Sequence, residues 1–330
     1  MKTPKTVLLG TGYSVPEKVL TNQDLEKMVD TNDQWIQERT GIKERRIASP
    51  ELTTSELCTR AARKALHDAG LKPKDIDVIL VGTVTGDALF PATACYVQEK
   101  LGAVNAAAMD LQAACAGFVY VSTMADALIS SGKAKHVLTI GGELLSRIVD
   151  WTDRSTCVLF GDGAGAAVWG AANDKNANKG IIDTYMKSDG RLTELLCSYG
   201  GGTKIPMKEA VENNQHFIKM QGQEVFKSAV KAMSEAVKSI LAKNGLTGED
   251  VDVLIPHQAN IRIMNATVRK TKIAEEKVYV NVDRFGNTSA ASIPIALAEA
   301  RETGAIKPGQ LILLVSFGGG FTWGSLLLQV

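Results

Sequence analysis

Short apolar runs alternate with longer amphipathic segments along most of the chain. Runs rich in Val, Ile and Leu predict strands at 76–82, 105–112, 136–140, 251–255 and 311–315. One intervening segment has helical spacing; it begins after Thr53, which could form a capping box with Glu56, and ends at Gly70. Strands that alternate with helices in this way predict an α/β fold.

Part of this pattern occurs twice. The segment A-A-R-K-A-L-H-D-A-G-L-K-P-K-D-I-D-V-I-L-V-G at 61–82 is similar to A-V-K-S-I-L-A-K-N-G-L-T-G-E-D-V-D-V-L-I-P-H at 236–257, at an offset of 175 residues. A second pair, F-G-D-G-A-G-A-A-V-W at 160–169 and F-G-G-G-F-T-W-G-S-L at 317–326, occurs in the same order. Two similarities in register indicate an internal duplication.

Two βα halves packed about a pseudo-dyad account for both pairs better than chance similarity between single units. We expect residues 1–172 and 181–330 to form these halves. The segment N-D-K-N-A-N-K-G at 173–180 is polar and rich in turn-forming residues, which is typical of a linker. The active site is expected at the junction of the halves, where strand ends and helix N-termini meet.

Cys115 is predicted to lie at a strand-to-helix turn. The strand-like run at 105–112 leads into A-A-C-A-G-F-V-Y-V-S-T-M-A-D-A-L, which is apolar nearly all round from Cys115 to Leu128, as in a buried helix. The N–H groups and positive dipole end of that helix are expected to favour the thiolate, and Gly117 leaves room for a substrate. Position alone also allows a packed core cysteine.

His257 and Asn287 are candidates for the same cleft. His257 follows the apolar run V-D-V-L-I-P, and the C-terminal end of a buried strand is the usual place for chemistry in α/β proteins. Asn287 lies in a turn before the helix that the repeat places opposite the Cys115 helix. At a strand offset of 174, Cys115 corresponds to Ser289, so the repeat brings Asn287 towards Cys115. Each residue alone has an ordinary structural explanation; their convergence favours catalysis.

Composition narrows the function classes. The 330 residues are 45% apolar and 22% charged, as in globular proteins with a large core, and the net charge of +1 gives no global case for nucleic-acid binding. The apolar run near the N-terminus is too short for a signal peptide and no run is long enough for a membrane helix, so we expect a cytoplasmic protein. Five cysteines without a C-x-x-C pair argue against a disulfide framework and a zinc site.

Seven motifs together resemble those of the β-ketoacyl-acyl carrier protein synthase III family over essentially the whole chain. They are T-N-D-Q-W-I-Q-E-R-T-G-I-K-E-R-R at 31–46, D-L-Q-A-A-C-A-G-F at 110–118, T-D-R-S-T at 152–156, F-G-D-G-A-G-A at 160–166, I-P-H-Q-A-N at 255–260, G-N-T-S-A-A-S-I-P at 286–294 and F-G-G-G-F-T-W-G at 317–324. A Cys–His–Asn set separates this family from the Cys–His–His elongating synthases and from thiolases.

The resemblance implies a thiolase-like fold with duplicated halves in five layers, αβαβα. It also implies a homodimer that condenses an acyl-CoA primer, with acetyl-CoA as the expected one, with malonyl-acyl carrier protein. The product is 3-oxoacyl-acyl carrier protein, the start of type II fatty acid synthesis. The resemblance implies no metal and no cofactor, since acyl-CoA is a substrate. It also implies no nucleic-acid partner and no membrane partner.

By the same resemblance, Cys115 is the nucleophile, while His257 and Asn287 serve decarboxylation and condensation. The backbone N–H groups of Cys115 and Gly319 form the implied oxyanion hole. The implied coenzyme A contacts are Thr31, Trp35, Arg39, Arg154, Asn260 and Arg262, with the adenine between Trp35 and Arg154. Phe160 and Phe90 are placed at the acyl pocket, Phe90 at that of the partner subunit.

A basic patch is expected near the histidine strand. Its members could share one face and dock the acidic carrier protein; they are Lys227, Arg262, Arg269 and Lys270. A solvated helix face is the plainer explanation for the same charges.

Several alternatives remain open. One is a condensing enzyme or acyltransferase of secondary metabolism with other acyl donors, and the long segment at 199–215 leaves the acyl preference open. A cysteine protease also uses Cys, His and Asn, but its C-G-S-C-W signature is missing. The glycine-rich segments at 10–15 and 161–166 are weak dinucleotide-binding matches. A catalytically silent scaffold is the last alternative.

Overall fold

Two mixed β-sheets form the frame of the computed structural model, which describes residues 6–173, 176 and 178–330. The first sheet has the order β1-β7-β6-β4-β5 and contains β1 (Thr6–Ser14), β4 (Val78–Gly82), β5 (Ala107–Leu111), β6 (His136–Leu144) and β7 (Asp162–Ala171). The second has the order β11-β12-β13-β8 and contains β8 (Gly180–Ser188), β11 (Val253–Pro256), β12 (Leu311–Gly318) and β13 (Thr322–Gln329). Two small pairs are β2 (Val19–Thr21) with β3 (Glu44–Arg46) and β9 (Leu196–Cys197) with β10 (Lys219–Met220).

Helices make up the remaining regular structure. The α-helices are α1 (Asn22–Glu26), α2 (Asp33–Thr40), α3 (Thr54–Ala69), α4 (Thr93–Leu101), α5 (Gly117–Ser130), α6 (Arg154–Cys157), α7 (Met207–Glu212), α8 (Gly222–Lys243), α9 (Ile261–Thr271), α10 (Val282–Phe285) and α11 (Ser292–Glu302). The 3-10 turns are η1 (Pro73–Asp75), η2 (Ala114–Ala116), η3 (Leu145–Arg147), η4 (Gly190–Leu195), η5 (Glu275–Lys277) and η6 (Ser289–Ala291).

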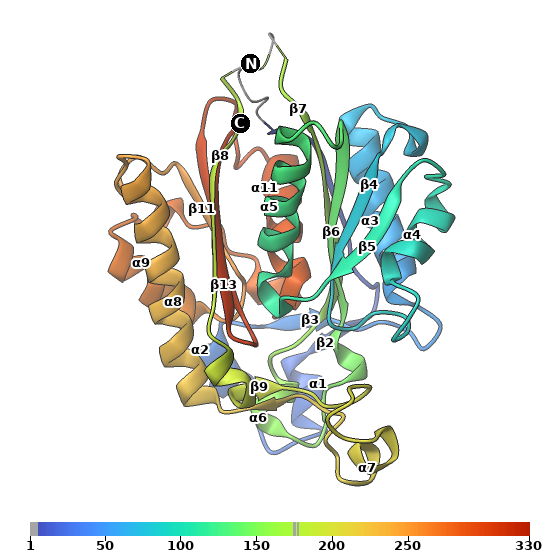
Figure 1. Cartoon of the computed structure of the whole chain (residues 1–330). Helices are drawn as coiled ribbons and strands as arrows, with labels where there is room; N and C mark the ends of the chain where they lie inside the picture. Colours follow the sequence, from blue (N-terminus) through green and yellow to red (C-terminus); the bar gives the residue numbers. More distant parts are fainter. Residues whose placement is uncertain (1–5, 174–175, 177) are drawn as a thin grey trace.

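The layers follow the order αβαβα. Helices α5 and α11 lie between the two sheets, α3 and α4 cover the outer face of the first sheet, and α8 and α9 cover the outer face of the second (Figure 1). The central helices are mostly apolar because they pack between the sheets; Phe118, Leu297, Leu314 and Leu326 belong to one continuous core there. The predicted α/β architecture is confirmed.

The duplication is visible in the strand pairing. In the first sheet β4 is parallel to β6, which is antiparallel to β7, which is antiparallel to β1. In the second sheet β11, β12, β13 and β8 repeat the same relations. Within the described part of the chain, a single parallel bridge between Leu254 and Val278 marks the position in the second sheet that β5 holds beside β4.

The repeat also fixes the register of the two active-site turns. Ala114 opens η2 at φ 45° and Ser289 opens η6 at φ 49°, both positive, and the two are 175 residues apart. Cys115 therefore corresponds to Ala290, and the prediction that pairs it with Ser289 is wrong by one residue. The predicted linker between the halves, at 173–180, includes residues 174, 175 and 177, which lie outside the described residues.

Local predictions mostly hold, with one exception at α3. Thr53 caps this helix by accepting the Glu56 N–H, and Gly70 ends it at φ 66°. The expected capping box is incomplete, because the Glu56 carboxylate bonds Arg60 at 3.1 Å instead of returning to the cap. All five predicted strands occur, shifted by a few residues at their ends.

Glycines let the central turns approach the sheet. A Cβ on Gly141 of β6 would lie 2.1 Å from the carbonyl oxygen of Ala290, and a Cβ on Gly82 would lie 2.9 Å from the backbone of Gly117. Side chains at these positions would push η6 and α5 away from the strand ends. Among the described residues, no helix combines the length and apolar character needed to cross a membrane.

Candidate active site

Three predicted catalytic residues line one cavity of about 500 Å³. Cys115 lies in η2 before α5, His257 directly follows β11, and Asn287 lies between α10 and η6. The structure thus brings together residues from both halves, as predicted. Cys197 of β9 also lines this cavity.

Cys115 is held by the opposite half of the molecule. Its carbonyl oxygen accepts a 2.6 Å hydrogen bond from the Ser316 hydroxyl of β12. A Cβ on Gly318 would lie 2.5 Å from the Cys115 nitrogen, so only glycine allows β12 to approach this turn. Gly319 lines the cavity beside the turn, which places a second backbone N–H in the same region as that of Cys115.

The thiol is the stable form of Cys115 near neutral pH. Burial raises the pKa of the Cys115 thiol to about 12, and a hydrogen bond with the Ser289 side chain lowers it only in part. Burial thus acts against the predicted stabilisation of the thiolate by the helix end. Acylation of this cysteine accordingly requires a route for its proton.

His257 is neutral. It is 2% exposed, and burial lowers its pKa to about 3. Nδ1 lies 2.6 Å from the Ser292 oxygen, which also accepts the Gln258 N–H at 3.4 Å. The Gln258 N–H occupies one lone pair of the Ser292 oxygen, and the Ser292 hydroxyl hydrogen can point to Nδ1 of His257. This arrangement favours the imidazole tautomer with its proton on Nε2.

Asn287 is oriented by its neighbour. Its side-chain oxygen accepts the Ser289 N–H at 2.9 Å, which leaves the amide NH₂ as the donor end of the side chain. Its backbone pairs with the first half, donating to the Leu159 oxygen at 2.9 Å and accepting from the Gly161 N–H at 3.0 Å. These contacts hold the Asn287 amide donor in place where the two halves meet.

The expected coenzyme A contacts cluster around Trp35. The guanidinium carbons of Arg154 and Arg39 lie 4.8 and 5.2 Å from the Trp35 ring centre. Arg154 also donates to the Asp30 carbonyl at 2.7 Å. Because Arg154 stacks on Trp35 directly, an adenine between them would have to separate the pair.

The remaining expected contacts lie along α9 and before α2. Asn260 lines the cavity and caps α9 by accepting the Ile263 N–H, and the exposed Arg262 lies 5.7 Å from the Phe226 ring. The buried hydroxyl of Thr31 has no hydrogen-bond partner among the described residues. A bound substrate could satisfy that hydroxyl.

One side of the cavity is apolar. Its side chains there include Leu145, Ile148, Phe160, Leu196 and Ile218. Phe90 is 85% exposed and does not belong to the lining of its own chain's cavity. Ser198 and Gly200 line the cavity, so the long segment at 199–215 begins at its wall.

The proposed docking residues lie on α8 and α9. Arg262, Arg269 and Lys270 are exposed on α9. Lys227 of α8 pairs with Glu224 at 2.8 Å, which neutralises part of its charge. The exposed charges named here are therefore basic along α9, whereas α8 carries both a basic and an acidic side chain.

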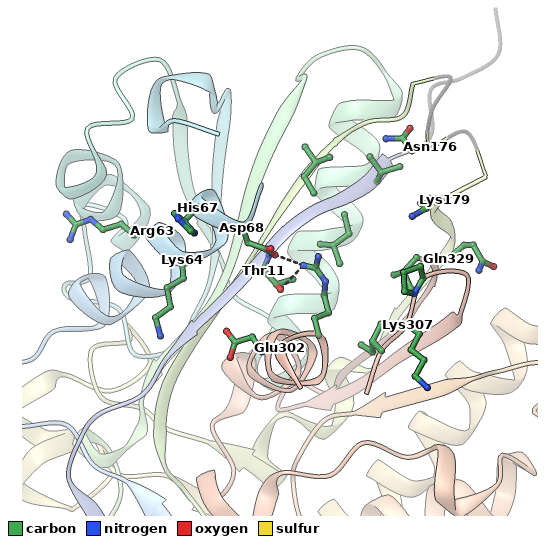
Figure 2. Close-up of a pocket in the computed structure, with 17 residues that line it drawn as sticks. Thr11, Arg63, Lys64, His67, Asp68, Asn176, Lys179, Glu302, Lys307 and Gln329 are labelled. Atoms are coloured by element: carbon green, nitrogen blue, oxygen red, sulfur yellow. Dashed lines mark hydrogen bonds and ion pairs between the residues drawn. The ribbon is translucent and has the colours of Figure 1, made fainter. Parts of the chain in front are cut away.

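A second groove, of about 880 Å³, lies between α3 and α11 over β1 (Figure 2). Although it is larger than the Cys115 cavity, none of the predicted catalytic residues lines it. Arg301 spans it by donating to Asp68 at 2.7 Å and to Thr11 at 2.8 Å. These bonds occupy Arg301, Asp68 and Thr11 with one another, and the smaller cavity, which brings the three predicted catalytic residues together, is the better active-site candidate.

Sequence reasoning missed three polar residues of the site: Glu143, Ser289 and Ser292. Glu143 is fully buried at the end of β6 and accepts a hydrogen bond from the Ser289 hydroxyl. A charged residue at the end of the apolar run 136–144 was the available signal. The two serines resemble ordinary turn residues and give no such signal.

Comparison with known proteins identifies the family. Models of 3-oxoacyl-[acyl-carrier-protein] synthase III match residues 109–190 and, for its C-terminal part, 241–330. A β-ketoacyl-[acyl-carrier-protein] synthase III of Caldanaerobacter subterraneus subsp. tengcongensis is 54% identical over 323 residues, covering 98% of this chain and 97% of the relative. This chain belongs to the β-ketoacyl-acyl carrier protein synthase III family.

Solved structures agree with this assignment. The 3-oxoacyl-[acyl-carrier-protein] synthase III of Aquifex aeolicus VF5 is 50% identical with a TM-score of 0.91, covering 98% of this chain and all of that one. A priming β-ketosynthase of the R1128 polyketide pathway is 33% identical with a TM-score of 0.90, covering 100% of this chain and 98% of that one. The predicted thiolase-like fold and the acyltransferase class of condensing enzyme are confirmed.

Proposed function

We propose that this enzyme catalyses the decarboxylative Claisen condensation of an acyl-CoA primer, with acetyl-CoA as the expected one, with malonyl-acyl carrier protein. The product is 3-oxoacyl-acyl carrier protein, which begins type II fatty acid synthesis. The observation that carries the proposal is one cavity that joins a cysteine, a neutral histidine and an oriented asparagine amide beside an apolar wall. These groups suit a thioester reaction in two stages.

The first stage acylates Cys115. Its sulfur attacks the thioester carbon, the bond from that carbon to the coenzyme A sulfur breaks, and coenzyme A leaves as a thiol. The backbone N–H groups of Cys115 and Gly319 are proposed to stabilise the oxyanion. Phe160 and the apolar wall around it are proposed to hold the acyl chain.

The second stage uses His257 and Asn287. Loss of carbon dioxide from the malonyl thioester leaves negative charge on the thioester oxygen, which needs hydrogen-bond donors. A neutral imidazole with its proton on Nε2 and the Asn287 amide can both donate. The resulting carbanion attacks the acyl-enzyme and releases Cys115. These steps call on no metal or cofactor.

The substrate path is proposed to run from Trp35 and Arg154, around the adenine, past Asn260 to Cys115. Arg39, Thr31 and Arg262 are proposed to contact the phosphates and pantetheine along it. The exposed basic residues of α9, with Lys227, are proposed to dock the acidic carrier protein.

A homodimer is proposed through the edge of the first sheet. Strand β5 ends that sheet; Val104 before it and Met109 within it are exposed, as is Phe90 in the segment between β4 and α4. An exposed apolar sheet edge favours pairing with a second copy. Phe90 would then be placed at the partner's acyl pocket, and a monomeric mass in sedimentation equilibrium would contradict this arrangement.

Two broader predictions also stand as proposals. The units 1–172 and 181–330 are proposed as the two halves, supported by the matching strand relations of the two sheets. A cytoplasmic location is proposed, since carrier-protein substrates of this kind are soluble.

The decisive experiment is an intact-mass measurement after exposure to a panel of acyl-CoAs, followed by addition of malonyl-carrier protein. We expect one acyl mass per chain, mapped by peptide digestion to Cys115, and its loss on condensation. Mapping must resolve Cys197, since it lines the same cavity. Acylation at Cys197, or at none of the five cysteines, refutes the mechanism. Acylation without use of malonyl-carrier protein favours a synthase with another extender.

A further inference from the structure

Glu143 is a buried carboxyl for which the proposed mechanism has no role. It is 0% exposed, and its Oε2 accepts from the Thr85 hydroxyl at 2.5 Å, the Thr85 N–H at 3.1 Å and the Thr83 hydroxyl at 3.2 Å. The Val84 N–H lies 3.2 and 3.1 Å from its two oxygens, and Oε1 accepts from the Ser289 hydroxyl at 3.2 Å. So many donors suit a carboxylate acceptor.

Ser289 lies between this carboxyl and the nucleophile. Its hydroxyl donates to Glu143, it lines the same cavity as Cys115, and hydrogen bonding from its side chain lowers the pKa of the Cys115 thiol. Its φ of 49° is strained for a residue other than glycine, and its N–H holds the Asn287 side chain. Strain of this kind, kept by the surrounding structure, is typical of functional positions.

A hydroxyl has one hydrogen and two lone pairs, so Ser289 can accept from one neighbour while it donates to the other. With the thiol protonated, the chain runs from the Cys115 S–H to the Ser289 oxygen and from the Ser289 O–H to Glu143. With the thiolate formed, both hydrogens have shifted by one bond: Glu143 donates to Ser289, and Ser289 donates to sulfur. The same contacts serve both states.

We propose that Ser289 and Glu143 take up the Cys115 thiol proton during acylation, an inference that rests on the proposed function. The thiol proton passes to the Ser289 oxygen as the hydroxyl proton passes to Oε1 of Glu143. The sulfur electron pair forms the bond to the acyl carbon, and the bond from that carbon to the coenzyme A sulfur breaks. The proton returns through Ser289 to the departing sulfur, so acyl-enzyme and free coenzyme A thiol are the products.

Acidity supports the direction of this relay. Burial raises the pKa of Glu143 to about 7, opposed by the hydrogen bonds from Thr85 and the other donors, so the carboxylate is available at neutral pH. His257 is a poor base, because burial lowers its pKa to about 3. Glu143 therefore serves acylation, and His257 is left as a donor for the second stage.

Other ionisable groups lie around Glu143 on the elements packed against it. Cys58 of α3 and Cys115 of η2 are thiols whose pKa values burial raises, and both feel the charge of Glu143. Asp162 lies opposite Leu144 on β7 and bonds Ser146 and Ala48 instead. Asp87 and Asp110 act on Cys58 from the side of α4 and β5.

The test follows acyl mass on Cys115 by quenched flow between pH 5.5 and 9.5 in Glu143→Gln and Ser289→Ala. The wild-type rate should rise with pH and level off around the pKa of Glu143, because the relay needs the carboxylate. Each variant should acylate on the order of 100-fold more slowly at pH 7.5 and keep rising to high pH, since its thiol must ionise unaided. Thr83→Ala, which removes one donor to Glu143 but keeps the relay, should lose less than tenfold.

The outcomes separate a relay from a structural role. A slower rate with an unchanged pH profile means that Glu143 only supports the fold, and it overturns the proposal, as does acylation within threefold of wild type. If Glu143→Gln does not fold, Ser289→Ala decides, because it keeps the backbone N–H that holds Asn287. Wild-type enzyme that takes no acyl group on Cys115 instead refutes the proposed function.

Discussion

His257→Ala and Asn287→Ala should impair the second half-reaction far more than the first. Acylation develops its negative charge opposite backbone donors, and its proton is proposed to leave through Ser289. Decarboxylation develops charge on the malonyl thioester oxygen, for which the side chains of His257 and Asn287 are the proposed donors. Both variants should therefore still form acyl-enzyme.

The size of the effect follows from the geometry of each donor. His257 is neutral because burial lowers its pKa to about 3, and Ser292 holds its Nδ1 at 2.6 Å, so the other nitrogen is presented in a fixed orientation. Asn287 is fixed by the Ser289 N–H at 2.9 Å. Loss of one preorganised donor of this type costs about 3–4 kcal/mol, or roughly 100- to 1000-fold in the rate of decarboxylation.

The assay follows the two half-reactions separately, as acyl mass on the protein and as labelled carbon dioxide released from malonyl-carrier protein. Asn287→Asp is the matched control: its carboxylate can still accept the Ser289 N–H but brings no NH₂ donor, so it should fail at decarboxylation as the alanine variant does. A variant that releases carbon dioxide at the normal rate yet cannot be acylated would refute this division of labour.

Two further predictions concern binding. Trp35→Ala or Arg154→Ala should raise the KM for acyl-CoA by roughly 5- to 150-fold, since a stacking contact on a base contributes about 1–3 kcal/mol, with little change for malonyl-carrier protein; equal effects on both substrates contradict the adenine site. Arg269→Glu should raise the KM for malonyl-carrier protein at low salt and approach wild type at high salt, because screening weakens the attraction. Unchanged carrier-protein kinetics at low salt remove Arg269 from the docking patch.

The sequence was sufficient for the fold class and for the meeting of Cys115 with His257 and Asn287. Periodicity located the strands, and the internal repeat placed the strand ends opposite each other. The repeat could not supply the exact register, because an offset of 174 or 175 fits the strands about equally well; the positive φ angles of Ala114 and Ser289 decide it. The sequence also could not predict the protonation states of the site's side chains, since these depend on burial in the folded protein.

The Cys115 thiol shows this limit most clearly. A cysteine at the start of an apolar helix predicts a stabilised thiolate, yet burial raises its pKa to about 12. The chain positions of Glu143 and Ser289, 146 residues apart, do not suggest that they share a hydrogen bond. Their role became visible only when the strand end of one half was seen against the turn of the other.

The duplicated architecture explains why the site needs both halves. At an offset of 175, Gly82 and Gly141 of the first half correspond to His257 and Ser316 of the second, and Glu143 corresponds to Gly318. Contacts run crosswise: β12 holds the nucleophile through Ser316, while Glu143 at the end of β6 holds Ser289.

Two equivalent turns have therefore acquired different chemistry. The turn of the first half carries the thiol, and that of the second carries the Ser289 hydroxyl, which lines the same cavity. Glycine at Gly141 and Gly318 lets each turn approach the opposite strand end. Because each half positions the reactive group of the other, a substitution that pushes the halves apart should weaken acylation and decarboxylation together. Gly141→Ala, whose Cβ would meet the Ala290 oxygen, is the variant in which that joint loss should be measured, and selective loss of one half-reaction would contradict the crosswise arrangement.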